Sequence, residues 1–153
     1  MTLVMRPAAR GDLPAIVGLL FDDENGRTRE DPSEPLDPRY LAAFDAIDAD
    51  PNQQLIAAEL DGEIVGTMQL SFLPGLSFRG AWRGQIEAVR IASHLRGQRL
   101  GEAMILWAVE QCRARDCKMV QLTSKADRTA AHRFYARLGF TQSHAGMKLH
   151  LRD

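Results

Sequence analysis

The segment from residue 84 to about residue 115 constrains the fold more than any other part of this chain. It begins as an apolar strand, GQIEAVRI, continues through a polar stretch with two glycines, SHLRGQRLGEA, and ends as a helix. A second short apolar run follows at residues 119–123. Because two strands joined through a helix pair in parallel, the segment predicts a β-α-β unit within an α/β protein.

The remaining elements are predicted from periodicity and turn residues. Asp61-Gly62 lies between two apolar runs, which is the strongest short-range signal for a hairpin. Strands are expected at residues 3–6, 54–60, 63–73, 84–91, 119–123 and 140–151. Helices are expected at residues 12–20 (with Asp12 as cap), 38–47 and 127–138, and a further helix follows the polar stretch SHLRGQRLGEA and ends at about residue 115. The order β-α-α-β-β-β-α-β-α-β describes a mixed, mostly antiparallel sheet with helices on both faces.

Length and composition describe an ordinary globular protein. The chain has 153 residues, of which 45% are apolar and 25% charged, so a single domain over residues 1–153 is expected. No apolar run approaches the ~20 residues of a membrane helix, and the start does not resemble a secretory signal. Two cysteines, Cys112 and Cys117, form no CxxC or Cys/His cluster. We therefore expect a cytoplasmic protein with reduced thiols, no metal and no membrane partner.

The net charge of −1 conceals two oppositely charged segments. Ten acids against three arginines leave residues 21–50 at −7, and twelve basic residues against five acids leave residues 79–137 at +7. Residues 21–40 are rich in proline and turn formers, which predicts a long surface loop. Such an arrangement favours two partners of opposite sign, although each segment alone could be solvated surface. Without an overall basic excess, a nucleic-acid partner is not expected.

A candidate anion site lies between the strand and the helix of the 84–115 segment, in the sequence RGQRLGEA at residues 96–103. Backbone N–H groups at a helix N-terminus bind anions, and Gly97 and Gly101 let the backbone approach a ligand closely. Arg96 and Arg99 add positive charge. A plain strand-to-helix turn explains the glycines equally well, and the spacing is neither GxGxxG nor a P-loop.

Two motifs resemble the GNAT superfamily of acetyl-CoA-dependent N-acetyltransferases. The stretch IEAVRI at residues 86–91, followed by QRLGEA at 98–103, resembles the strand and loop that bind acetyl-CoA. The stretch AHRFYARLGF at residues 131–140 resembles the family's A-x-x-F-Y-x-x-x-G-F helix. The opening VMRPAARGDLPAIVGLL resembles its first strand and helix. The resemblance covers essentially the whole chain and implies a GNAT-like fold, with acetyl-CoA as cosubstrate.

The resemblance also implies which residues contact acetyl-CoA. The strand would bond the pantetheine arm through its main chain, and the loop amides would hold the pyrophosphate. Arg128, where the family often has asparagine, is expected to face an anion such as a CoA phosphate. The positions implied for cofactor binding are Val89, Arg90, Ile91, Arg96, Gly97, Gln98, Arg99, Leu100, Gly101, Glu102 and Arg128.

Two catalytic residues are implied in the same way. Tyr135 matches a tyrosine placed near the thioester sulfur as general acid, whereas helical spacing alone would make it a core residue. Glu87 matches a glutamate that takes the amine proton. Strict alternation places Glu87 on the face of Val89 and Ile91. The alternative is a structural ion pair between Glu87 and either Arg83 or Arg90.

The function expected is acetyl transfer to a primary amine of a small molecule. In the family, the segment between the first two helices partly lines the acceptor site, and here that segment is acidic, which favours a cationic amine. A non-catalytic acyl-CoA-binding sensor on the same fold is the alternative, and a phosphate-binding protein without thioester chemistry is a third. A homodimer is also compatible with the sequence.

Overall fold

The computed structural model describes residues 2–152, which form two compact units. The first unit ends at Gln121 and the second begins at Leu122. The strands are β1 (Leu3–Pro7), β2 (Gln53–Leu60), β3 (Glu63–Leu73), β4 (Arg83–Ile91) and β5 (Met119–Leu122). The helices are α1 (Leu13–Phe21), α2 (Pro38–Ala49), α3 (Ser77–Gly80), α4 (Leu100–Ala114) and α5 (Thr129–Arg137), with 3₁₀ turns at Arg10–Asp12, Gly26–Thr28 and Ser93–Leu95.

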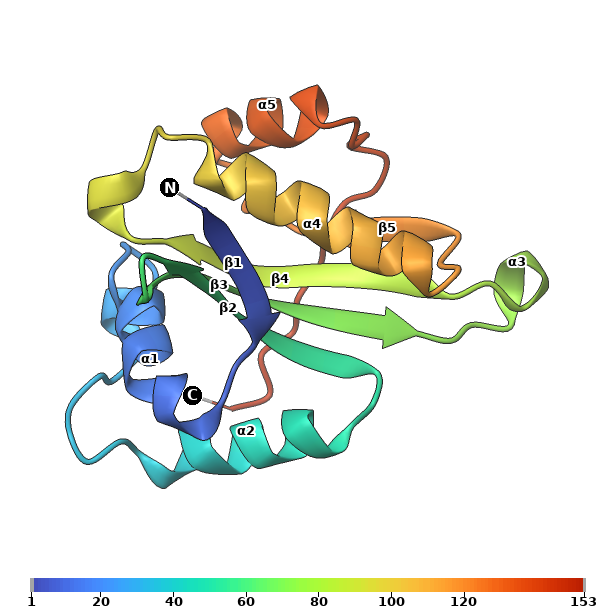
Figure 1. The fold of residues 1–153 in the computed structure, drawn as a ribbon. Coiled ribbons are helices and arrows are strands. Elements are labelled where there is room, and N and C mark those ends of the chain that lie inside the picture. Colours follow the sequence, from blue (N-terminus) through green and yellow to red (C-terminus); the bar gives the residue numbers. More distant parts are fainter. Residues whose placement is uncertain (1, 153) are drawn as a thin grey trace. The chain divides into compact units, whose positions relative to one another are not determined.

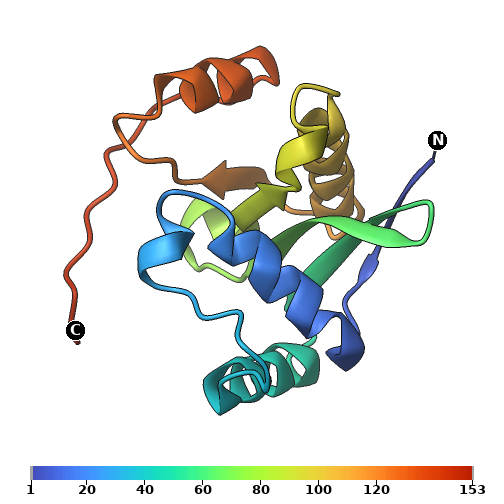
Figure 2. The ribbon, with the colours of Figure 1, turned by 90° about the vertical axis from the view of Figure 1, so that its left-hand side faces the viewer.

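The strands form one sheet in the order β1-β2-β3-β4-β5, and the pairs from β1 to β4 are antiparallel. Asp61 and Gly62 connect β2 and β3 with positive φ angles of 52° and 80°, the geometry that a two-residue hairpin requires. Helices α1 and α2 cover one face of the sheet and α4 covers the other (Figures 1 and 2). The predicted hairpin, the mostly antiparallel sheet and the helices on both faces are confirmed.

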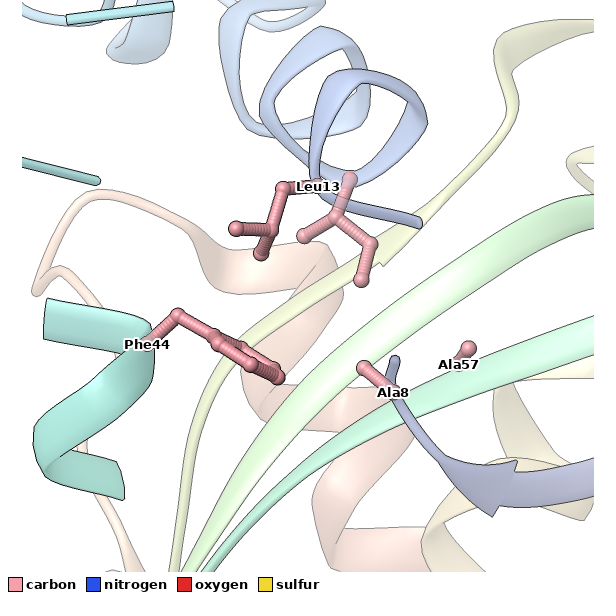
Figure 3. Packing of buried hydrophobic residues seen from close by; sticks show 5 residues of the cluster. Ala8, Leu13, Phe44 and Ala57 are labelled. Atoms are coloured by element: carbon pink, nitrogen blue, oxygen red, sulfur yellow. The ribbon is translucent and has the colours of Figure 1, made fainter. Parts of the chain in front are cut away.

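A hydrophobic core fills the space between α1, α2 and the sheet. Leu13 of α1, Phe44 of α2, Ala8 and Ala57 belong to one buried cluster, and the Phe44 ring points toward Ala8 in Figure 3. These four side chains are all at most 9% exposed. The small side chains of Ala57 on β2 and of Ala8 directly after β1 let both helices pack closely, so the start of the loop that joins α1 to α2 is held near the sheet.

Helix α4 packs on the opposite face of the sheet, where two glycines permit close approach. A Cβ at Gly66 would lie 2.8 Å from Met104 Sδ and 3.1 Å from the Arg90 carbonyl. A Cβ at Gly84 would overlap Cys112 Sγ. Met104, Ile105, Ala108 and Cys112 are each at most 1% exposed. The helix is therefore fixed against β3 and β4 near both of its ends.

The start of α1 differs from the prediction in its capping. Asp12 precedes the helix, but its side chain makes no cap hydrogen bond to α1. Its carboxylate instead accepts hydrogen bonds from the Ala9 N–H at 2.7 Å and from the Arg6 guanidinium at 2.6 and 3.0 Å. These bonds hold the pKa of Asp12 below its ordinary value, the Arg6 bonds being the largest cause. The residue closes the 3₁₀ turn before the helix.

The prediction of a strand at residues 140–151 is wrong. No strand occurs among the described residues after 122. Apolar side chains do alternate there, but those of Met147, Leu149 and Leu151 are 84–92% exposed. Alternation predicts a strand only where a neighbouring strand supplies hydrogen bonds and a core covers one face, and the structure gives these residues neither. Helix α5 does end as predicted, with Gly139 at a φ of 99°.

Substituting Gly84 tests the contact between α4 and the sheet. Gly84→Ala should lower the free energy of unfolding by ~1–3 kcal/mol, because the new methyl group overlaps the buried Cys112 sulfur. Gly11→Ala, where the added carbon meets nothing within 4 Å, is the matched control. In urea titrations, Cys112→Ala should recover part of the loss in the double variant. Equal stability of Gly84→Ala and the wild type would contradict the close contact.

Candidate functional site

Strand β4 contains a bulge at the centre of the candidate site. Gln69 of β3 pairs with Glu87 and Thr67 pairs with Arg90, so Met68 alone lies opposite Ala88 and Val89. Ala88 has a φ of 54°, in the left-handed region that alanine rarely adopts. A bulge leaves its extra residue out of the ladder, so main-chain groups of this part of β4 are available to another hydrogen-bonding partner.

The bulge corrects the predicted direction of the Glu87 side chain. Ile91 pairs with Gly66, which faces α4, whereas Glu87 and Arg90 pair with Gln69 and Thr67 on the other face. Glu87 therefore shares a face with Arg90 and not with Ile91. Strict alternation fails because one extra residue reverses the faces beyond it. The local sequence gives no signal for this, since bulges with positive φ usually contain glycine.

Glu87 is exposed, and the Gln85 amide is 3.5 Å from its carboxylate. The two arginines considered as structural partners have contacts elsewhere. Arg83 donates to the Gln121 side-chain oxygen at 3.5 Å, and Arg90 Nε lies 2.7 Å from Asp23 Oδ2. The observed geometry thus leaves the Glu87 carboxylate on an accessible surface, where a small molecule can reach it.

The turn between β4 and α4 has the geometry of an anion site. Gly97 and Arg99 have positive φ angles of 84° and 62°, and residues 96–99 are all exposed. The Ala103 N–H donates to the Arg99 carbonyl at 3.1 Å, so the N–H groups before Ala103 lack the acceptor that a longer helix would supply. A Cβ at Gly97 would meet nothing within 4 Å. The turn is therefore open to solvent and precedes N–H groups of the kind that bind anions at helix N-termini.

The second unit holds the other predicted residues on α5. Ala131, Phe134, Tyr135 and Leu138 are half-buried, as the helical spacing predicts, and the Tyr135 ring makes edge contacts with Phe134 and Phe140, at centroid distances of 5.1 and 5.8 Å. Arg128 is exposed and precedes the helix as its N-cap residue. An exposed guanidinium there can contact an anion from solvent.

Several carboxylates in the loop of residues 22–37, here called the α1–α2 loop, already have partners within the protein. Four of the loop's carboxylates form ion pairs with arginines, at N···O distances of 2.6–3.5 Å. The pairs are Asp22 with Arg27, Asp23 with Arg90, Glu30 with Arg29 and Asp37 with Arg39. Asp31 also accepts two hydrogen bonds from Ser33. Arg90 is the one arginine of these pairs outside residues 21–50, so the net charge of the segment stays strongly negative, although these carboxylates are already engaged with arginines.

Across residues 2–152, no helix is both long and apolar enough to cross a membrane. Within the same range, no group of three or more His, Cys, Asp or Glu side chains gathers as metal ligands would.

Comparison with known proteins identifies the family. Residues 19–140 match the Acetyltransferase (GNAT) family. The chain belongs to the GNAT acetyltransferase family. The match extends across both units and includes β4, the turn before α4 and all of α5. The fold, with its five-stranded, mostly antiparallel sheet, is that of GNAT proteins.

This GNAT chain is similar to three proteins of different origin. Aminoalkylphosphonate N-acetyltransferase of Salmonella typhimurium strain LT2 is 35% identical over 95 residues, which cover 62% of this chain and 61% of that protein. A Bacillus halodurans C-125 structure described as a transcriptional regulator is 43% identical, with a TM-score of 0.95, over 98% of this chain and 100% of that one. A Trypanosoma brucei acetyltransferase is 28% identical, with a TM-score of 0.79, over 98% and 100%.

Substituting Gly101 tests the anion site. Gly101 is the second residue of α4, where a branched side chain would obstruct a ligand lying against the first-turn N–H groups. Gly101→Val should therefore weaken CoA binding at least ~10-fold, the loss of a charge-assisted hydrogen bond being worth about 1.5–3 kcal/mol. Gly18→Val, also within a helix, is the matched control. Calorimetry showing equal CoA affinity in a folded Gly101→Val protein would contradict this site.

Proposed function

We propose that this chain transfers the acetyl group of acetyl-CoA to a primary amine by direct attack of the amine nitrogen. The observation that carries the proposal is the position of Glu87, an exposed carboxylate directly before the bulge in the strand that leads to the anion site. The GNAT family is one of acyl-CoA-dependent N-acetyltransferases, which supports the reaction class. Its match across both units supports a single acetyltransferase domain over residues 1–153.

The proposed coenzyme contacts follow β4 and the turn after it. Acetyl-CoA supplies a thioester carbonyl activated for attack. Main-chain groups of Val89, Arg90 and Ile91 beside the bulge would hold the pantetheine arm, and the N–H groups of residues 97–102 would hold the pyrophosphate. The Arg96 N–H donates to the Ser93 carbonyl at 3.4 Å, so Arg96 would contribute through its side chain. The exposed guanidinium groups of Arg96, Arg99 and Arg128 would add charge for the phosphates.

Glu87 is proposed as the base. An alkyl ammonium group has a pKa near ~10, so at neutral pH the acceptor must lose a proton before its nitrogen can attack. An exposed carboxylate can accept that proton directly or through water and pass it to solvent. Attack then forms the N–C bond and breaks the C–S bond. Cys112 is no rival nucleophile, because burial raises the pKa of its thiol to about 11.

Tyr135 is proposed as a hydrogen-bond donor to the departing sulfur. A phenol with a pKa of ~10 gives up its proton to a thiolate of pKa ~8.5 only uphill, so full proton transfer is not required. A donated hydrogen bond is strongest when the sulfur carries most charge, which lowers the barrier more than it strengthens binding. The edge contacts with Phe134 and Phe140 fix the plane of the tyrosine ring.

The acceptor is proposed to be a small primary amine that meets the face of β4 carrying Glu87. The α1–α2 loop borders this face, because its Asp23 contacts Arg90 there. Aminoalkylphosphonates are the first candidates, since the Salmonella typhimurium relative is named for them. The net negative charge of the loop still favours an amine that carries a positive charge, but several of its carboxylates already pair with arginines and do not contact the amine directly.

A non-catalytic acyl-CoA sensor is the second candidate. It is favoured by the likeness to the Bacillus halodurans protein described as a transcriptional regulator. A sensor has no use for a base, however, and the exposed Glu87 beside the bulge favours the enzyme. A sensor would bind CoA with no release of thiol from acetyl-CoA when amines are added.

The pH dependence of two variants tests the catalytic roles. Glu87→Gln should lower kcat/KM by ~10²–10⁴ at neutral pH, and the loss should shrink as pH rises, because more of the amine is then already deprotonated. Tyr135→Phe should lower kcat with little change in acetyl-CoA affinity. Glu63→Gln, at an exposed glutamate where β3 begins, is the matched control for Glu87→Gln. A deficit of Glu87→Gln that is equal at every pH would reject the base.

A panel of amines tests the acceptor class. Thiol release from acetyl-CoA should be fastest with aminoalkylphosphonates and slower with polyamines or basic amino-acid esters. If the acidic loop does attract cations, polyamines should instead lead, and their KM should rise with ionic strength. If CoA binds but none of these amines causes thiol release from acetyl-CoA, the result would favour the sensor.

A further inference from the structure

An ion pair joins the α1–α2 loop to the bulged strand. Arg90 Nε lies 2.7 Å from Asp23 Oδ2, and the side chains are only 12% and 20% exposed. A second Arg90 nitrogen, Nη1, donates to the carbonyl of Val89 at 2.9 Å. One guanidinium therefore contacts both the loop and a main-chain oxygen beside the bulge.

Asp23 also determines the local shape of the loop. Its Oδ1 accepts a hydrogen bond from the Gly26 N–H at 2.6 Å, which closes the turn at residues 23–26. A Cβ at Gly26 would overlap the carbonyl of Leu20, so the turn packs tightly against the end of α1. Burial disfavours ionisation of Asp23, but the bonds from Gly26 and the charge of Arg90 outweigh it and hold its pKa below the ordinary value.

The anion site has its own contact with the same loop. Arg96 Nη2 donates to the Asp22 carbonyl at 3.3 Å, next to the ion pair in sequence. The two contacts differ in strength, since the Arg96 bond is long and exposed whereas the Asp23–Arg90 pair is short and largely shielded from solvent. Solvent screens the exposed contact more than the shielded one.

We propose that the Asp23–Arg90 ion pair couples the coenzyme to the acceptor side, with Arg90 and Asp23 as positioning residues. The proposal rests on the proposed function. A coenzyme hydrogen-bonded along β4 changes the surroundings of the Val89 carbonyl, and therefore of the Arg90 guanidinium that donates to it. The same guanidinium pairs with Asp23, whose carboxylate closes the turn at residues 23–26. Coenzyme binding therefore orders the α1–α2 loop, and by linkage an acceptor bound at the loop strengthens coenzyme binding by the same factor.

Hydrogen exchange of the loop tests the coupling without any acceptor. In the wild type, saturating CoA should slow exchange of amides 22–30 at least ~5-fold, the lower end of ordinary coupling between sites. Asp23→Asn keeps an oxygen for the Gly26 N–H but removes the charge facing Arg90, so CoA should change its loop exchange less than twofold. Asp22→Asn, one residue away and paired at 3.5 Å on the exposed surface, should respond as the wild type does.

Kinetics provide the second readout once an amine substrate is known. Asp23→Asn should raise the acceptor KM ~5-fold or more and change kcat less than twofold, whereas Asp22→Asn should change neither. Arg90→Lys, which keeps the charge but loses the planar fork, should fall between them. It also replaces Asp23→Asn if that variant proves unfolded.

Two results would overturn the coupling. One is slowing of loop exchange by CoA that is equal in Asp23→Asn and the wild type. The other is wild-type loop exchange that CoA leaves unchanged although calorimetry shows binding. Failure of CoA to bind at all would instead reject the proposed function and the coupling with it, so the two failures are distinguishable.

Discussion

The contact between α4 and the sheet places the parts of the candidate site that lie in the first unit. Gly66 and Gly84 let the helix approach β3 and β4 to a distance at which any side chain would collide. The buried Met104 and Cys112 occupy the space that these glycines leave. Because the helix is held near both ends, its N-terminal N–H groups and the main chain of β4 keep a fixed separation. A ligand that needs both sets of donors finds them already arranged, which lowers the cost of ordering them on binding.

The bulge at Ala88 provides chemistry that a regular strand cannot. It frees main-chain groups for a ligand and turns Glu87 and Arg90 toward the same face, where the α1–α2 loop contacts the strand. A left-handed alanine costs ~1–2 kcal/mol relative to a glycine there. Strain of this kind persists only where surrounding packing imposes it, and it is typical of functional sites.

The sequence predicts the parts of the fold that depend on local signals. The Asp61-Gly62 hairpin, the helix stripe with Phe134 and Tyr135, and the turn before α4 all follow from residue type and spacing. The predictions that fail depend on contacts between separate elements of the fold. The direction of Glu87 depends on a bulge that no glycine marks, Asp12 turns to Arg6 instead of capping α1, and residues 140–151 lack a neighbouring strand. The pairing of Asp23 with Arg90 joins residues 67 positions apart, so the charge of the acidic segment could not reveal it.

The buried Cys112 thiol gives the molecule a reporter of its own. Its sulfur lies where α4 meets Gly84, and Cys112 as a residue is 1% exposed, whereas Cys117 is half-buried. A thiol reagent can reach Cys112 only after the helix separates locally from the sheet, and the raised pKa slows the reaction further. The two cysteines should therefore be modified at different rates. The slower rate measures how often the helix end leaves the strand, and ligands that stabilise the arrangement of α4 and β4 will protect Cys112 from alkylation.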